Sequence, residues 1–174
     1  YHTLKIMAEK FAAALLDLGV KSQDKVMIYI PNSIQWVVSF LAIQRIGSVC
    51  VPITPIYTPH DLEYIAKDSG VSVIICADTN FGYVQKVLGT TGIKRTIYVR
   101  MADLLPLWKQ YFGRIYDIIP KGKVATGEHI YSLKRLLSKY KEPNLPPVED
   151  GKDKIAQILY TGGTTKYPKG VPMS

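Results

Sequence analysis

The residues best suited to chemistry lie in one short segment, 160–171, which reads Tyr-Thr-Gly-Gly-Thr-Thr-Lys-Tyr-Pro-Lys-Gly-Val. Its glycines let the backbone approach a ligand closely and present N–H groups to it. The threonine hydroxyls add donors, and Lys169 adds a mobile cation. Donors and one cation on a loop that follows an apolar strand suit a polyphosphate.

Two other interpretations of this segment must be considered. It differs from a Walker A loop, which ends in Gly-Lys-Ser/Thr, because here the order is Lys169-Gly170. A surface hairpin rich in turn residues has the same composition, and composition alone does not separate the two.

The elements that must position this loop alternate between helix and strand. Apolar residues recur at helical spacing over 4–18, and Gly19 follows them. Continuous apolar runs typical of buried strands alternate with further helical patterns. We expect strands at 25–30, 48–53, 71–76, 95–99 and 153–161, and helices at 33–47, 58–70, 79–88 and 132–140. This order predicts an α/β fold: a mostly parallel βαβ sheet with flanking helices.

One helix start is unusually well marked in the sequence. Thr58 is a capping residue, Pro59 occupies the first helical position, and Asp61 places a carboxylate three residues after the cap. We therefore expect a helix that begins at residue 58 and ends near Gly70.

We divide the chain into three ranges. Residues 1–100 form the α/β subdomain, 101–153 a basic and aromatic insertion with a short helix and a connector, and 154–174 a strand with the truncated phosphate-binding loop. Residues 109–141 include eight basic residues and only two acidic ones, so this stretch carries six of the eight net positive charges. Four aromatic residues lie at its start or directly before it: Trp108, Tyr111, Phe112 and Tyr116.

The basic stretch has three interpretations. We favour packing against another part of the protein, place contact with an anionic membrane second, and expect no nucleic-acid partner, although cations with aromatic residues can stack on bases. No apolar run approaches the length of about 18–20 residues that spans a bilayer. No signal peptide opens the sequence, so we expect a cytoplasmic protein, with peripheral contact at the inner face of the membrane as the alternative.

The cysteines and histidines indicate structural roles. Cys50 and Cys76 each lie within a β-branched apolar run, as buried thiols in a reducing compartment do. His2, His60 and His129 are scattered and show no metal-ligand spacing.

Segment 160–171 resembles the nucleotide-binding signature of the adenylate-forming (AMP-binding) superfamily, Tyr-Thr-Ser/Gly-Gly-Thr-Thr-Gly-x-Pro-Lys-Gly-Val. That superfamily includes acyl-CoA synthetases, luciferases and peptide-synthetase adenylation domains. Ten of its eleven specified positions agree here, and the exception is Lys166 in place of glycine. Glycine permits a positive φ that lysine adopts less readily, so the exception bears on the loop's conformation.

The resemblance extends, in order and spacing, to residues 24–33, 47–52, 55–59 and 68–70. Residues 57–59 and 103–106 look most like long-chain fatty acid–CoA ligases. The resemblance implies the amino-terminal part of such an enzyme. The family's adenine and ribose contacts, acidic metal ligand, hinge and catalytic lysine lie further along, so we expect this chain alone to be inactive.

The resemblance also implies a reaction and its ligands. The family uses ATP and Mg²⁺ to convert a fatty acid into an acyl-adenylate, from which CoA takes the acyl group. Lys169 would be the catalytic cation, and Thr161 would also reach the metal. The nucleotide-binding residues would be Thr161, Gly162, Gly163, Thr164, Thr165, Lys169 and Gly170. The alternatives are a short- or medium-chain or aryl-CoA ligase, and a basic membrane- or nucleic-acid-binding module.

Overall fold

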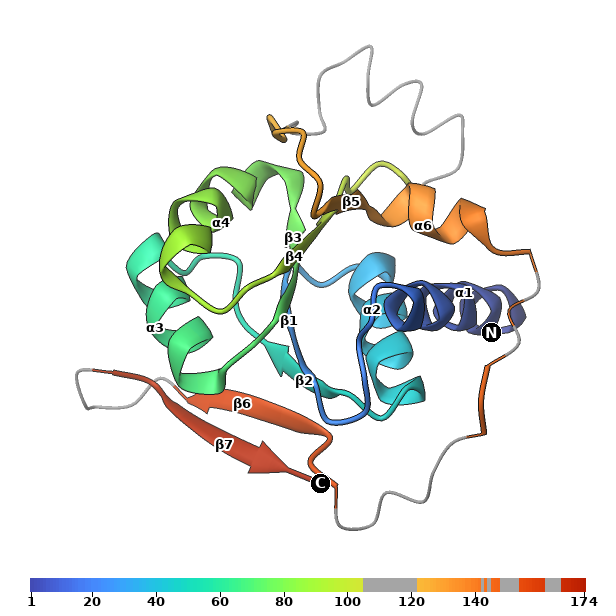
Figure 1. The fold of residues 1–174 in the computed structure, drawn as a ribbon, viewed down its shortest axis with the longest axis horizontal. Coiled ribbons are helices and arrows are strands. Elements are labelled where there is room, and N and C mark those ends of the chain that lie inside the picture. The colour runs from blue at the N-terminus through green and yellow to red at the C-terminus, as the bar shows by residue number, and fades with distance from the viewer. Residues whose placement is uncertain (105–121, 142, 144, 148–153, 162–166) are drawn as a thin grey trace.

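A computed structural model describes residues 1–104, 122–141, 143, 145–147, 154–161 and 167–174 of the chain (Figure 1). In these residues, seven strands form one sheet in the order β5-β4-β3-β1-β2-β6-β7. Every neighbouring pair is parallel except β6 and β7, which pair antiparallel at one edge. The predicted α/β fold with a mostly parallel sheet is confirmed.

The strands are short and, in the middle of the sheet, almost completely buried. The central strands are β1 (Lys25–Tyr29), β2 (Val49–Pro52), β3 (Val73–Ala77) and β4 (Arg95–Val99). The outer strands are β5 (Ile130–Ser132), β6 (Gln157–Thr161) and β7 (Lys169–Met173). Continuous burial of the central strands is what a parallel sheet covered on both faces requires.

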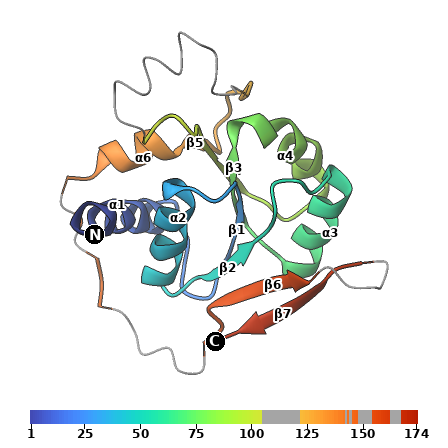
Figure 2. The same cartoon turned by 180° about the vertical axis from the view of Figure 1, so that it is seen from behind.

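Helices cover both faces of the sheet, as the two opposite views show (Figures 1 and 2). One face carries α1 (His2–Asp17), α2 (Ile34–Arg45) and α6 (Leu133–Lys139). The other carries α3 (Pro59–Ser69) and α4 (Phe81–Val87). Alternate residues of each strand point into opposite cores: Val26 and Ile28 join the first, Met27 and Tyr29 the second.

Side chains cap two of these helices, and the cap predicted at residue 58 is confirmed. The Ser33 hydroxyl accepts a hydrogen bond from the Trp36 amide at 3.2 Å and begins α2. Thr58 and Asp61 form a reciprocal capping box at the start of α3, with the Thr58 amide 3.0 Å from the Asp61 carboxylate. Gly70 ends this helix with a φ of 69°, which glycine adopts at little cost.

The structure differs from the sequence-based expectations in three places. The helix expected at 79–88 is a shorter α4 between two 3₁₀ turns, Asp78–Asn80 and Leu88–Thr90. The three-residue strand β5 was not anticipated within the insertion. Residues 169–173 form β7 rather than the end of an open loop. Within the predicted insertion, residues 105–121, 142, 144 and 148–153 lie outside the described residues, and the division into three ranges stays a prediction.

Candidate functional site

The candidate site is the mouth of the β6–β7 hairpin. Thr161 is the last residue of β6, Lys169 is the first of β7, and the two are partners in the antiparallel register. The Thr161 hydroxyl lies 3.5 Å from the Lys169 carbonyl oxygen and donates to it. Both side chains are exposed. The hairpin therefore presents a hydroxyl and a cation side by side.

The sheet places this mouth where ligands usually bind in parallel α/β proteins. β6 runs parallel to β2, so Thr161 stands at the carboxyl end of its strand. Open parallel sheets bind their ligands beyond the carboxyl ends of the strands. The position favours a binding loop over a surface turn of no consequence.

The predicted site residues divide into two groups. The structure brings Thr161, Lys169 and Gly170 together at the hairpin mouth. The residues that lie outside the described part of the chain are Gly162, Gly163, Thr164, Thr165 and Lys166. Nucleotide binding by either group, and metal binding by Thr161, stay predictions.

The hairpin contacts helix α3 through Tyr160, the residue before Thr161. The Tyr160 hydroxyl donates a hydrogen bond to the Asp68 carboxylate at 2.5 Å. The ring is partly buried and packs against the core on the α3 face of the sheet. Burial, and then the Asp68 carboxylate, raise the pKa of the Tyr160 phenol above its usual range. The phenol therefore keeps its proton at neutral pH and remains a donor.

A second contact joins Tyr167, two residues before β7, to the same helix. The Tyr167 ring stacks on the Tyr64 ring, with centroids 4.8 Å apart and planes inclined by 24°. His60 lies four residues before Tyr64 in α3, and the centroid of its ring is 6.4 Å from that of Tyr167. Stacked aromatic pairs of this kind add to the contribution of the area that they bury.

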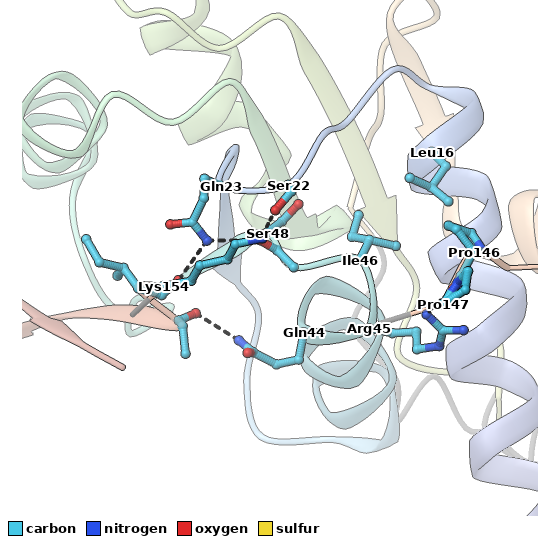
Figure 3. Close-up of a pocket in the computed structure, with 13 residues that line it drawn as sticks. Leu16, Ser22, Gln23, Gln44, Arg45, Ile46, Ser48, Pro146, Pro147 and Lys154 are labelled. Carbon is cyan, nitrogen blue, oxygen red and sulfur yellow. Dashed lines mark hydrogen bonds between the residues drawn. The ribbon is translucent and has the colours of Figure 1, made fainter. Parts of the chain in front are cut away.

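A cavity of about 350 Å³ lies at the opposite end of β6 (Figure 3). It is lined by the residues that precede β1, β2 and β6, and thus by the amino ends of the strands. The Gln44 amide nitrogen donates to the Ala156 carbonyl oxygen at 2.8 Å, and that of Gln23 to the Ile155 carbonyl oxygen at 3.3 Å. These side chains tie the start of β6 to α2 and to the loop before β1, so we assign the cavity walls a structural role.

The cysteines match their expected role. Cys50 and Cys76 are fully buried free thiols. Burial raises the pKa of the Cys50 thiol to about 12. Burial and the nearby Asp78 carboxylate raise the pKa of Cys76 as well. Neither thiol is suited to nucleophilic chemistry.

Among the residues that the structure describes, no three or more His, Cys, Asp or Glu side chains are grouped so that they could hold a metal ion. No helix in the described part of the chain has the length and apolar character needed to cross a bilayer.

Sequence reasoning did not identify the contacts between the hairpin and α3. Tyr160, Tyr167, Tyr64 and Asp68 were not among the predicted site residues. The available signal was helical spacing: Tyr64 and Asp68 lie four residues apart and therefore share a face of α3. The antiparallel pairing of β6 with β7, which brings residues 160 and 167 to that face, has no such local signal.

Comparison with known proteins places this geometry in a family. The model of the family described as AMP-binding enzyme matches residues 1–174. A long-chain-fatty-acid–CoA ligase of Bacillus subtilis is 31% identical over 180 residues, which cover 100% of this chain and 31% of the relative. The chain thus spans about a third of the length of that curated relative.

Solved structures agree with the fold. A long-chain-fatty-acid–CoA ligase from Archaeoglobus fulgidus superposes with a TM-score of 0.75 at 26% identity, over 99% of this chain and 29% of the other. An anthranilate CoA ligase in complex with anthranoyl-AMP superposes with a TM-score of 0.77 at 22% identity, over 97% and 28%. The second likeness concerns the fold alone.

Proposed function

The chain belongs to the AMP-binding enzyme family, and on this premise we propose that it is part of an ATP-dependent long-chain fatty acid–CoA ligase. The observation that carries the proposal is the pairing of Thr161 with Lys169 at the carboxyl end of a sheet strand, within a family match over residues 1–174. The relative from Bacillus subtilis, named for the same activity, supports the choice of substrate.

The proposed reaction has two steps. A carboxylate oxygen of the acid attacks the α-phosphorus of ATP, the bond to the β-phosphate breaks, and pyrophosphate leaves. The thiolate sulfur of CoA then attacks the acyl carbon, and AMP leaves with the electrons of the broken C–O bond. The first step needs cations and donors near the phosphates, because charge shifts onto the departing pyrophosphate.

The hairpin residues suit that requirement. Lys169 would place its ammonium group against the phosphates as the catalytic cation, and the Thr161 hydroxyl would donate beside it. Gly162, Gly163, Thr164, Thr165 and Gly170 would complete the loop with backbone N–H groups and hydroxyls. Mg²⁺, when bound, would neutralise phosphate charge. It takes oxygen ligands, and the exposed hydroxyl of Thr161 could be one of them.

A second candidate is an aryl-CoA ligase. The observation that favours it is the fold of the anthranilate CoA ligase, which is as similar to this chain as the fold of the fatty-acid enzyme. Both candidates share the phosphate-binding loop and differ in the acid. Membrane contact through the basic stretch remains a further proposal, because residues 105–121 lie outside the described part of the chain.

The test is the exchange of labelled pyrophosphate into ATP by the full-length protein. Palmitate or oleate should stimulate exchange much more than acetate or benzoate does. Preference for benzoate would favour the aryl-CoA ligase. If none of these acids stimulated exchange, both candidates would be contradicted. The chain of 174 residues alone should show no exchange, because it spans only 31% of its relative's length.

A further inference from the structure

We propose that Tyr160 and Asp68 are positioning residues that attach the strand leading into the phosphate-binding loop to helix α3. We call the Tyr160–Asp68 hydrogen bond and the Tyr64–Tyr167 stack together the α3 anchor. The inference rests on the proposed function for the identity of the ligand, ATP. Its structural part, attachment of both ends of the loop to one helix, is independent of that identity.

The first contact fixes the strand that leads into the loop. Tyr160 directly precedes Thr161, and its hydroxyl donates to Asp68 at 2.5 Å. One peptide unit therefore separates this hydrogen bond from the hydroxyl proposed to meet phosphate. A charge-assisted hydrogen bond so close in sequence restricts where Thr161 can lie.

The second contact fixes the chain just before strand β7, on the far side of the loop. Tyr167 lies two residues before Lys169, and its ring stacks on Tyr64. Tyr64 and Asp68 are four residues apart in α3, so both contacts use the same face of the helix. Tyr160 and Tyr167, on either side of segment 162–166, are therefore both held by helix α3.

Helix α3 is itself firmly placed. Its start is closed by the capping box of Thr58 and Asp61, and its inner face buries Leu62, Ile65 and Ala66. Attachment of the residues on either side of the loop to such a helix fixes the positions of Thr161 and Lys169, and misplacement of a binding group by about 1 Å can cost a hundredfold in rate. The α3 anchor thus acts on ATP binding through Thr161 and Lys169, without touching the ligand.

The test separates positioning from general stability by removing single polar atoms. Tyr160→Phe keeps the packed ring and deletes the hydroxyl, and Asp68→Asn removes the carboxylate charge. Tyr140→Phe is the matched control, because Tyr140 is also partly buried and also donates to an exposed aspartate, Asp17, but joins α6 to α1.

In pyrophosphate exchange by the full-length protein, each of the two site variants should raise the KM for ATP about five- to tenfold, because Asp68 is exposed and its bond is weakened to the level of an ordinary hydrogen bond. The KM for the fatty acid should stay unchanged. The double variant should be no worse than the more affected single variant, because both remove one interaction. Tyr140→Phe should leave both KM values unchanged. The proposal would be overturned if the KM values for ATP and for the fatty acid rose equally, or if the effects of the two substitutions added in the double variant. The same rise of the KM for ATP in Tyr140→Phe would also overturn it.

A second measurement does not depend on enzymatic activity. Without nucleotide, trypsin should cleave the bonds after Lys166 and Lys169 several times faster in Tyr160→Phe than in the unchanged protein or in Tyr140→Phe, as mass spectrometry of the early products would show. Equal cleavage rates would refute the α3 anchor even if exchange activity is normal. Faster cleavage in a protein that shows no exchange with any acid would support the anchor and reject the proposed function.

Discussion

Gly170 lies opposite Tyr160 in the antiparallel pair of β6 and β7, and a Cβ atom on Gly170 would lie 3.0 Å from the Tyr160 Cζ atom. The same Cβ would lie 3.1 Å from the phenolic oxygen and 3.1 Å from Cγ2 of Ile158. Separations this short require the Tyr160 ring or the Ile158 side chain to shift by a few tenths of an ångström. Packing against Tyr160 and Ile158 therefore favours glycine at position 170, in addition to the place proposed for Gly170 in the nucleotide-binding loop.

Gly170→Ala should displace the Tyr160 ring and weaken its hydrogen bond to Asp68. We expect the full-length protein to lose about 1–3 kcal/mol of stability, as overpacked sites do, and its KM for ATP to rise in pyrophosphate exchange. Gly82→Ala is the control, because Gly82 lies in α4 and a Cβ there meets nothing within 4 Å. That variant should gain about 0.4–1 kcal/mol by restricting the unfolded chain. Equal thermal stability of the two variants would contradict the crowding at Gly170.

Lys169→Ala should weaken the adenylation step, because one cation that faces the phosphates is lost. Loss of a charged contact costs roughly 1.5–3 kcal/mol, or about 10–150-fold in pyrophosphate exchange at low ATP. Lys94→Ala is the control: Lys94 is also exposed but precedes β4, at the amino ends of the strands. A loss of similar size in both variants would indicate an effect of net charge instead of a local contact.

Lys166→Gly restores the residue of the family signature. We expect exchange activity equal to or higher than that of the unchanged protein, because glycine adopts positive φ without strain. The comparison requires only initial rates at saturating and at low ATP. A large loss of activity would show that Lys166 has its own contact with the phosphates.

The sequence predicts the central sheet well, because its signals are local. Continuous apolar runs define β1 to β4, and the residues Thr58, Pro59 and Asp61 mark the start of α3. Strand β5 has only three partly buried residues and depends on its neighbour β4 for its existence. Tertiary pairing of this kind leaves little trace in local propensity.

The candidate site is predictable to a lesser degree. Thr161 and Lys169 are found from residue type and order, and the structure places them as partners. The contacts of Tyr160 with Asp68 and of Tyr167 with Tyr64 join residues about a hundred positions apart. Such pairings depend on which edge of the sheet β6 occupies, and strand order is not encoded in any single segment.

Cys50 and Cys76 should resist alkylation in the native protein. The pKa of Cys50 is raised to about 12, so its thiolate fraction at pH 8 is lower by about three orders of magnitude than that of a free cysteine. Iodoacetamide labelling, followed by mass spectrometry of the two peptides, should show little modification at pH 8 and full modification in urea. Labelling should increase as the pH rises towards 12. Rapid native labelling of either residue would contradict its burial.

The capping box of α3 should make that helix sensitive to acid. Hydrogen bonds from the Thr58 hydroxyl and then the Thr58 amide lower the pKa of Asp61. A carboxylate with a depressed pKa stabilises the folded state above its unfolded value of about 3.9 and loses that contribution as the pH falls through its folded pKa. Because Asp61 is largely solvent-screened, we expect the contribution to be only about 0.5 kcal/mol. Hydrogen exchange of the α3 amides should therefore be less protected in Asp61→Asn at pH 6, and the difference should shrink as the pH falls below about 3.9.

The same box allows a test of the hydroxyl. Thr58→Ala removes the side-chain acceptor for the Asp61 amide and should lower the local free energy of unfolding of α3 by about 1 kcal/mol. Thr58→Ser keeps the hydroxyl and should retain most of the protection. Since α3 carries both contacts of the α3 anchor, Thr58→Ala should also speed tryptic cleavage after Lys166, while Thr58→Ser should not. If cleavage stays unchanged while α3 loses protection, the hairpin is held in place without the helix, and the anchor through Tyr64 and Asp68 is not what positions the loop.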